Sequence, residues 1–566
     1  MQRCRTQLVS PLLVAVMAVA PWTAEAIEPT PPTTDQAGMR LLMFLVVDQM
    51  TAEQLTDLRP HFQGGLRRLL DGAVEFTEAH HAHAVTVTAN GHASLATGAH
   101  PARHGIIDNQ WYDRREEKVV YCVADDDAQL IPPDDKTTYP SNSGRSPANM
   151  LVDGIGDWVK RLDTAALAFS ISGKDRSAIL LAGKKPDAAY WYDHQTGHFI
   201  TSAYYRLDYP PWLVDFMLEN HPDRKFPLVW RPLPVEPAIR DVFGLRPLDT
   251  GTFRWSFPHR IGNMSLAPNE SYYNDFIAQP GMDQQMVDLA LALVENEVLG
   301  RDASLDYLAV SFATLDYVGH DYGPHSPEVL DVLLRLDVAL GRLLDGLDAL
   351  VGLDHIVFTL SSDHGVQVVP EADPSGRTQR ADSDDVLCVQ SVGKALVERF
   401  GDEDWFVADG YLDYQAIGRT NLRRQDVEAE VARRLERCPA VARVWSRTGL
   451  TSKHQPDLPA EVAYHRKLFN NNFHRQRSGD VFVQLKENYL GRLDWGTTHG
   501  SPYGHDTHVP MLIVHPQVQP QKIAIRVATV DLAPTLAAML GLDIPDERDG
   551  IDRSPLFSFR APPAGR

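Results

Sequence analysis

Short runs of consecutive apolar residues recur along the chain and alternate with longer segments of helical periodicity. The first run, Leu41 to Val47, is apolar at every position, as expected of a strand that is buried on both faces of a parallel sheet. Four later runs are similarly apolar: Ala165 to Ile171, Tyr307 to Ala313, His355 to Leu360 and Pro510 to His515. Helical patterns at Gln284 to Leu299 and Pro327 to Leu350 lie between them. The alternation predicts an α/β fold with a mostly parallel central sheet flanked by helices.

The segment from 366 to 495 has a different composition. It opens with a loop rich in Pro, Asp and Ser (Pro370 to Asp385), contains a charged amphipathic helix near Gln425 to Arg437, and includes an Asn-rich patch at Asn470 to Asn472. We predict that 366–495 is a cap subdomain inserted between two parts of one core, 39–365 and 496–550. A C-terminal tail, 551–566, follows the core. Large α/β proteins often grow by such insertions.

The N-terminal residues have the features of a secretory signal peptide. Arg3 and Arg5 precede a short apolar run, Leu8 to Pro21, and the small-residue pattern Ala24-Glu25-Ala26 follows. The run is shorter than the ~20 residues that comfortably span a bilayer. We predict a signal peptide at 1–26, a flexible leader at 27–38, and a secreted, periplasmic protein with no membrane partner after cleavage. The alternative is an uncleaved membrane anchor.

Charge and cysteine content narrow the choice of partners. The formal net charge of the 566 residues is -21 and is spread along the chain, which argues against a nucleic-acid polymer as partner. A small anionic substrate remains compatible, because a bound metal can reverse the local field.

Cys122, Cys388 and Cys438 remain after signal cleavage and permit one disulfide, but the sequence does not select the pair. Nothing in the sequence indicates the oligomeric state.

Side chains with metal-ligand chemistry stand near the ends of several predicted strands. The set comprises three aspartates and three histidines: Asp48, Asp316, His320, Asp363, His364 and His499. Taken singly, Asp48 is more often a helix cap, and Asp316 with His320 is more often a surface pair on one helical face. Together they predict a metal site, because α/β sheets bind ligands beyond the carboxyl ends of their strands. The mixture of carboxylates and imidazoles suits zinc.

A threonine and two cationic residues have side chains that suit a phosphoryl group as ligand. The segment from Thr86 to Ser94 begins extended and turns into a helix, so the Thr88 hydroxyl lies near a helix N-terminus, where an alkoxide and a phosphate are stabilised. A simple N-cap is the alternative. Lys174 and Arg176 stand two residues apart in a segment that we expect to be extended, so both should point to one side and suit a dianionic phosphoryl group. A solvated charged turn is the alternative.

These residues resemble the motifs of the alkaline phosphatase superfamily. The likeness is carried by Phe44-Leu45-Val46-Val47-Asp48, Thr88 four residues before His92, Asp316-x-x-x-His320, Ser362-Asp363-His364-Gly365 and His499-Gly500. Further stretches are similar to its phosphate-irrepressible branch, which has a single threonine nucleophile and is related to nucleotide pyrophosphatases and phosphodiesterases: His104 to Asp113, Lys174-Asp175-Arg176, His499 to Tyr503 and Asp506 to Pro510. The stretch Val530 to Leu536 resembles the closing helix of the superfamily. The resemblance spans roughly 40 to 548 and implies an alkaline-phosphatase-like core.

The resemblance also implies roles for individual residues. One zinc would be held by Asp316, His320 and His499, and a second by Asp48, Asp363 and His364 with Thr88 in contact. Thr88 would be the nucleophile, and Asn109, Lys174 and Arg176 would bind the phosphoryl oxygens. His505 and His508 are alternatives to His499, which we prefer because it opens its motif. His80, His81 and His83 are better explained as a loop than as a separate metal site, and we treat His92 as structural.

The implied function is that of a secreted, zinc-dependent alkaline phosphatase. It would hydrolyse phosphate monoesters through a phospho-threonine intermediate and release inorganic phosphate. The main alternative is a phosphodiesterase or nucleotide pyrophosphatase with the same two metals, against which the Lys174 and Arg176 pair argues. A sulfatase is disfavoured because Thr88 occupies the position where those enzymes need Cys or Ser. A binding protein that lost catalysis is disfavoured because all the candidate ligands are present.

Overall fold

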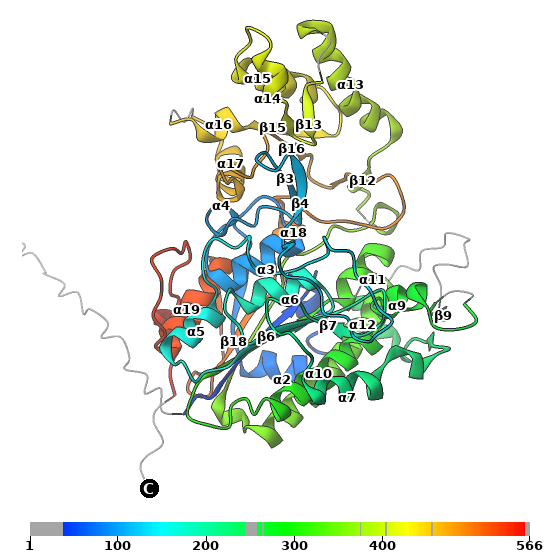
Figure 1. Ribbon diagram of the computed structural model, residues 1–566, viewed down its shortest axis with the longest axis vertical. Coiled ribbons are helices and arrows are strands. Elements are labelled where there is room, and N and C mark those ends of the chain that lie inside the picture. Colours follow the sequence, from blue (N-terminus) through cyan, green and yellow to red (C-terminus); the bar gives the residue numbers. More distant parts are fainter. Residues whose placement is uncertain are drawn as a thin grey trace, which may run out of the picture. The chain divides into compact units, whose positions relative to one another are not determined.

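A nine-stranded sheet forms the centre of the computed structural model (Figure 1). The structure describes residues 38–243, 257–262, 265–373, 375–401, 404–453 and 457–560. In spatial order the strands are β19 (Gln521–Ala528), β2 (Val74–His80), β18 (Met511–Val514), β11 (Ile356–Ser361), β1 (Leu41–Val47), β10 (Asp306–Phe312), β5 (Ala168–Ser172), β6 (Ala188–Tyr192) and β7 (Phe199–Ile200). Most neighbours are parallel, and β18 and β7 run antiparallel to theirs. The predicted α/β fold with a mostly parallel sheet is confirmed.

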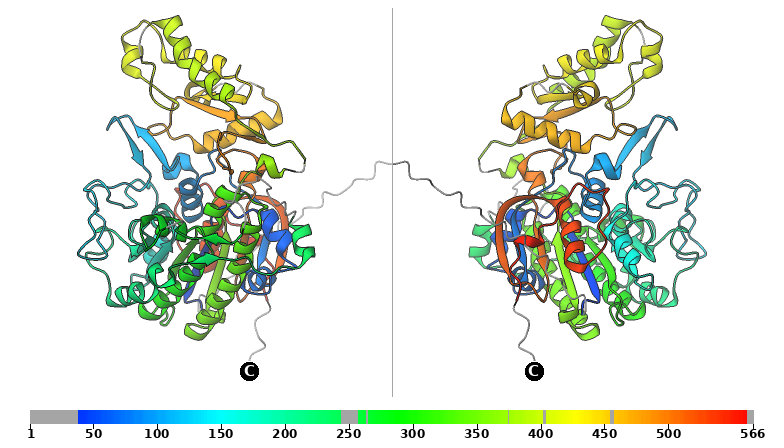
Figure 2. Two further views of the ribbon diagram at one scale, coloured as in Figure 1. Left: turned by 90° about the vertical axis from the view of Figure 1, so that its right-hand side faces the viewer. Right: turned by 90° about the vertical axis from the view of Figure 1, so that its left-hand side faces the viewer.

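Helices cover both faces of the sheet, as the further views in Figure 2 show. Every side chain of β1 is fully buried, and alternate residues point to opposite faces. Leu41, Met43 and Leu45 belong to one apolar core, whereas Leu42 and Phe44 belong to another. The first core is completed by α2 (Gly65–Gly72), α7 (Pro211–Asn220), α10 (Gly281–Asn296) and α12 (Pro327–Leu350). The second is completed by α3 (Thr88–Thr97), α5 (Ile155–Leu162) and α19 (Leu532–Leu540).

The segment predicted as a cap contains its own helices, small sheets and apolar cluster. Its helices and strands, yellow-green to orange in Figure 1, are β12 (Gln379–Arg380), α13 (Ser383–Phe400), β13 (Phe406–Ala408), β14 (Tyr411–Leu412), α14 (Tyr414–Gly418), α15 (Arg424–Leu435), β15 (Val441–Ser446), α16 (Arg447–Thr451), α17 (Ala460–Asn472), β16 (Val481–Leu485) and β17 (Tyr489–Leu490). Val392, Trp405 and Val431 belong to the cluster. A disulfide joins Cys388 to Cys438, and Cys122 is free and buried.

The predicted loop at the start of this segment is shorter than expected. The sequence analysis extended it to Asp385, whereas α13 begins at Ser383. The reason is a local cap: the Asp382 side chain accepts hydrogen bonds from the backbone N–H groups of Asp384 and Asp385. Such bonds satisfy donors that the first helical turn leaves free, and they allow a helix to begin in a segment rich in turn residues.

Several hydrogen bonds and ion pairs join the segment 366–495 to the rest of the chain, among them those of Asn472 and Arg114. Asn472, in the Asn-rich patch at the end of α17, accepts a hydrogen bond from Asn90 Nδ2 at 3.1 Å and donates one to the carbonyl of Ile107 at 3.1 Å. Arg114, which follows β3 (Gln110–Asp113), pairs with Asp480. All described residues belong to one compact unit. The Asn-rich patch, which the sequence analysis identified only by its composition, therefore holds the segment 366–495 beside α3.

The two chain ends were predicted to be a signal peptide with a leader and a tail. Residues 1–37 lie outside the described residues, and so do 561–566. The described part of the tail packs on the sheet: Phe557 is buried, and its ring centroid lies 6.0 Å from that of Phe76 in β2. Among the described residues, no helix has the length and apolar character needed to cross a bilayer.

Candidate metal centre

The candidate ligands converge because four neighbouring strands are parallel. Strands β11, β1, β10 and β5 lie side by side and end at the same edge of the sheet. Asp48 directly follows β1, Asp363 follows β11 by two residues, and α11 (Thr314–Tyr322), which carries Asp316, follows β10. Strand β18 is antiparallel to β11 and therefore begins at this edge, so the preceding loop brings His499 to the same place.

Asp316, His320 and His499 form the first ligand group. Asp316 Oδ1 lies 3.2 Å from His320 Nε2 and 3.6 Å from His499 Nε2, and the two Nε2 atoms are 3.2 Å apart. Asp316 and His320 stand on one face of α11, as predicted, while His499 comes from the loop before α18 (Gly504–Thr507). These three are close enough to hold one ion.

Asp48, Asp363 and His364 form the second group. His364 Nε2 lies 3.5 Å from Asp48 Oδ1 and 3.3 Å from Asp363 Oδ2, and all three side chains are fully buried. Helix α3 packs directly on this group, because a Cβ atom on Gly91 would lie only 2.0 Å from the carbonyl oxygen of Asp363. Glycine at this position lets the helix that carries Thr88 approach the carboxylates.

All three imidazoles are held by backbone carbonyls in the same way. His320 Nδ1 lies 2.9 Å from the carbonyl oxygen of Thr497, His499 Nδ1 lies 2.7 Å from that of Thr86, and His364 Nδ1 lies 3.0 Å from that of Gly365. A carbonyl oxygen only accepts, so each Nδ1 carries the proton and each Nε2 presents a lone pair to the site. Metal-binding histidines are oriented by such contacts.

The electrostatics of the cluster also fit divalent cations. Burial, together with neighbouring Asp363, raises the pKa of Asp48 to about 6. The Lys174 ammonium lies 2.7 Å from Asp48 Oδ2 and 2.6 Å from Asp316 Oδ2, which leaves Asp48 Oδ1 facing the site. Neither Asp48 Oδ1 nor His364 Nε2 forms a hydrogen bond within the described part of the chain. Buried acceptors without donors are costly, and a shared cation removes that cost.

The predicted nucleophile lies beside this cluster. Thr88 is the first residue of α3, after the N-cap residue Val87, and is almost completely buried. The guanidinium Nη2 of Arg176 lies 3.4 Å from Thr88 Oγ1. The backbone N–H of Ala89 donates to Asn109 Oδ1 at 3.0 Å, which holds the Asn109 amide at the start of the helix. Thr88, Asn109 and Arg176 are thus brought together.

The expected extended segment around Lys174 and Arg176 is wrong. Strand β5 ends at Ser172, whose hydroxyl accepts a hydrogen bond from the backbone N–H of Lys174 at 3.1 Å, and α6 (Asp175–Ala182) begins directly afterwards. Lys174 is the N-cap residue and Arg176 lies in the first helical turn. Both side chains still reach the site, but Arg176 faces Thr88 whereas Lys174 lies between the carboxylates of Asp48 and Asp316.

Two further residues contact the candidate ligands: Gln49, which the sequence analysis did not single out, and His92, which it treated as structural. Gln49 has a left-handed backbone (φ 73°), donates its amide to Asp316 Oδ1 at 2.6 Å, and donates its backbone N–H to Asp363 Oδ1 at 3.2 Å. His92 Nδ1 lies 3.2 Å from Asp363 Oδ2, and its Nε2 lies 2.8 Å from Ser311 Oγ. The available signal for Gln49 was a polar residue directly after Asp48 and before buried Met50.

Gln49→Ala is expected to weaken metal binding by roughly 10- to 100-fold, as the loss of other partners of metal ligands does. The amide is the contact that fixes Asp316 Oδ1, and alanine cannot replace it. Gly319→Ala should act similarly, because its Cβ atom would lie 1.8 Å from Gln49 Oε1 and displace the amide. Titration of the metal-free protein with zinc measures the effect.

Gly393→Ala in α13 is the matched control for the glycine variant. A Cβ atom there meets nothing within 4 Å, so zinc affinity should be unchanged. Unaltered zinc affinity in both Gln49→Ala and Gly319→Ala would show that Gln49 does not orient the ligands.

The other histidines have separate surroundings. His505 Nε2 lies 3.1 Å from Ser501 Oγ, and the ring of His508 stacks on that of His80 at 4.6 Å, where Glu78 is also near. His81 Nε2 lies 2.9 Å from the carbonyl oxygen of Ser362. Of the alternatives weighed in the sequence, His499 is the histidine that lies against Asp316.

Several known proteins are similar in sequence to this chain over most of its length. The family described as type I phosphodiesterase / nucleotide pyrophosphatase matches residues 42–509. Alkaline phosphatase PhoK of Sphingomonas sp is 30% identical over 544 residues, which cover 93% of this chain and 92% of that protein. Alkaline phosphatase PafA of Elizabethkingia meningoseptica is 29% identical over 526 residues, covering 89% and 92%. A crystal structure of PafA superposes with a TM-score of 0.79 at 28% identity, covering 91% of this chain and 98% of that one.

Proposed function

Because the chain belongs to the type I phosphodiesterase / nucleotide pyrophosphatase family, within the alkaline phosphatase superfamily, we propose that it is a phosphoric monoester hydrolase of the alkaline phosphatase type. The observation that carries the proposal is the Arg176 guanidinium 3.4 Å from the Thr88 hydroxyl, beside two groups of candidate metal ligands. A planar cation at this position suits the unesterified oxygens of a phosphoryl group.

The reaction would proceed in two displacements at phosphorus. The Thr88 oxygen attacks the phosphoryl group, the alcohol leaves, and a phospho-threonine forms; water then attacks phosphorus and releases inorganic phosphate while Thr88 regains its proton. Arg176 and the Asn109 amide would stabilise charge on the phosphoryl oxygens, and the N-terminus of α3 favours the Thr88 alkoxide. Two zinc ions in the ligand groups would supply Lewis acidity at Thr88 and at the leaving oxygen.

The choice of zinc and the export of the protein are parts of the same proposal. Each ligand group combines carboxylate oxygen with imidazole nitrogen, a mixture that zinc accepts and that calcium and magnesium seldom use. Export rests on the signal-peptide pattern in residues 1–26. The proposed substrates are small phosphate esters.

Arg176→Ala is expected to lower kcat/KM for p-nitrophenyl phosphate by about 10²- to 10³-fold, the effect of removing one contact that stabilises transition-state charge. Turnover of bis-p-nitrophenyl phosphate should be largely spared, because a diester has a second ester arm where the monoester has an anionic oxygen. Initial rates on the two esters measure the difference.

Arg161→Ala is the matched control, because Arg161 pairs with Asp153 on the surface and should leave both rates unchanged. Lys174→Ala is a less selective probe, since its ammonium also neutralises Asp48 and Asp316. Dominant diester turnover that does not depend on Arg176 would move the assignment to a phosphodiesterase with the same ligand groups.

A further inference from the structure

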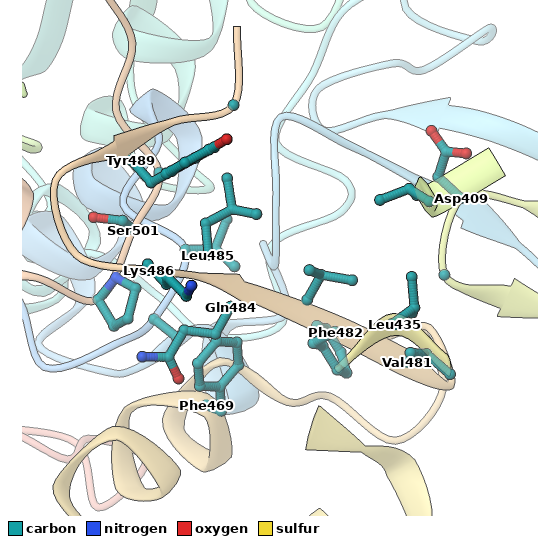
Figure 3. A pocket seen from close by; sticks show the side chains of 18 of the residues that line it. Asp409, Leu435, Phe469, Val481, Phe482, Gln484, Leu485, Lys486, Tyr489 and Ser501 are labelled. Carbon is teal, nitrogen blue, oxygen red and sulfur yellow. The ribbon is translucent and has the colours of Figure 1, made fainter. Parts of the chain in front are cut away.

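A cavity of about 800 Å³ lies where the cap meets the loop that carries His499 (Figure 3). Its cap side is formed by residues of α13, β13, α15, α17 and β16, and its core side by residues between Thr498 and Asp506. The figure shows side chains of β16 and Phe469 of α17 gathered around it. The volume is in the range of cavities that bind small organic ligands.

The walls of the cavity are largely apolar. Leu435, Phe469 and Phe482 line it together with two exposed valines, Val389 at 42% and Val483 at 40%. The valines come from different elements, α13 and β16. Apolar side chains left open inside a concave surface indicate a binding site, because a ligand that covers them removes apolar area from water.

The cavity borders the proposed metal centre at one of its ligands. His499, whose Nε2 faces Asp316, belongs to the lining. Thr88 and Arg176, where the phosphoryl group would bind, do not. The cavity therefore borders the group of Asp316, His320 and His499, which we place on the side of the leaving oxygen, and it does not border the nucleophile.

We propose that this cavity binds the organic part of the substrate, and that the enzyme favours phosphate monoesters whose leaving group is uncharged and contains an apolar ring. The inference rests on the proposed function and specifies its substrate class. The lining carries two exposed side chains of opposite charge, Lys486 and Asp409, whose effects on a charged leaving group oppose each other. Its third charged residue, Asp506, is buried and accepts a hydrogen bond from the backbone N–H of Ser501. Burial of a ring against Phe469, Phe482 and the two valines would supply the binding energy.

The test compares two monoesters on variants that add bulk to the cavity from two different elements. Val389→Trp and Val483→Trp are each expected to lower kcat/KM for 2-naphthyl phosphate by ~10-fold, as the loss of one buried apolar group does. Turnover of methyl phosphate, which has no ring to place in the cavity, should be unchanged. Two variants on separate elements keep the test valid if one of them folds poorly.

Each variant has a matched control on its own part of the cap. Leu387 in α13 is 59% exposed and Val407 in β13 is 39% exposed, and neither lines the cavity. Leu387→Trp adds the same indole to α13, and Val407→Trp adds it to β13. Both controls should leave the ratio of kcat/KM for 2-naphthyl phosphate to kcat/KM for methyl phosphate at the wild-type level.

The outcomes separate this inference from the proposed function. A selective loss of naphthyl turnover in both cavity variants would support the binding site. Equal turnover ratios in the cavity variants and the controls would overturn it, while methyl phosphate hydrolysis would leave the monoesterase standing. If the unchanged enzyme hydrolyses neither ester, the proposed function itself fails, and the role of the cavity in it fails too.

Discussion

Thr88→Ala is expected to lower phosphate-monoester turnover by about 10⁴-fold or more, the scale on which removal of a catalytic nucleophile acts. Thr88 begins α3, and its oxygen lies beside Arg176 with the second ligand group packed against the same helix. Alanine keeps the helix and removes only the hydroxyl and the methyl group. Steady-state rates on p-nitrophenyl phosphate give the loss, and acid quenching with labelled substrate tests for a phosphorylated enzyme.

Thr88→Ser is the matched variant, because it keeps the hydroxyl at the same helix position. We expect it to retain most of the activity and to form a labelled phospho-serine. Both variants should stay folded and keep the zinc held by the carboxylates and imidazoles, because neither change removes one of those six ligands. In Thr88→Ala only the contacts of the hydroxyl itself are lost. Substantial turnover by Thr88→Ala would exclude Thr88 as the nucleophile and favour direct attack by water.

The sheet could be predicted from the sequence because its central strands are buried on both faces. A strand such as β1 must be apolar at every position, and this pattern is distinct from that of any surface element. The polar residues that interrupt it, beginning with Asp48, then mark the carboxyl edge. The location of the candidate ligands follows from that edge and from the parallel order of β11, β1, β10 and β5.

Other features depend on contacts that no local pattern encodes. The antiparallel direction of β18 cannot be read from its four apolar residues, yet it decides that His499 reaches the site. Gln49 binds Asp316 across 267 positions of the sequence. The Cys388–Cys438 pairing likewise requires α13 and the end of α15 to be neighbours in space. Such contacts are set by tertiary packing, which overrides local propensity.

Tertiary packing also explains why the local structure at Lys174 and Arg176 was predicted wrongly. Their spacing was consistent with a strand, where residues two apart share a face, but β5 ends at Ser172 and the chain turns into α6. Both cations reach the site because the N-terminus of α6 lies at the carboxyl edge. The two cations therefore have different partners: Arg176 faces Thr88, while Lys174 balances the buried charge of Asp48 and Asp316.

Asp48→Asn is expected to reduce the zinc content from two ions per chain to one and to lower activity by at least ~10³-fold, more than the loss of a single charge-stabilising contact. The amide is almost isosteric but carries no charge, and Asp48 Oδ1 is the buried oxygen that faces His364 Nε2 at 3.5 Å. Elemental analysis after dialysis measures the zinc.

Asp306→Asn is the control: Asp306 is also buried, at the amino end of β10, where it accepts hydrogen bonds from the backbone N–H groups of Leu167 and Gly300. It should keep both ions even if it lowers stability. Full zinc content in Asp48→Asn would mean that this carboxylate does not hold the second ion, and the division of the site into two ligand groups would have to be abandoned.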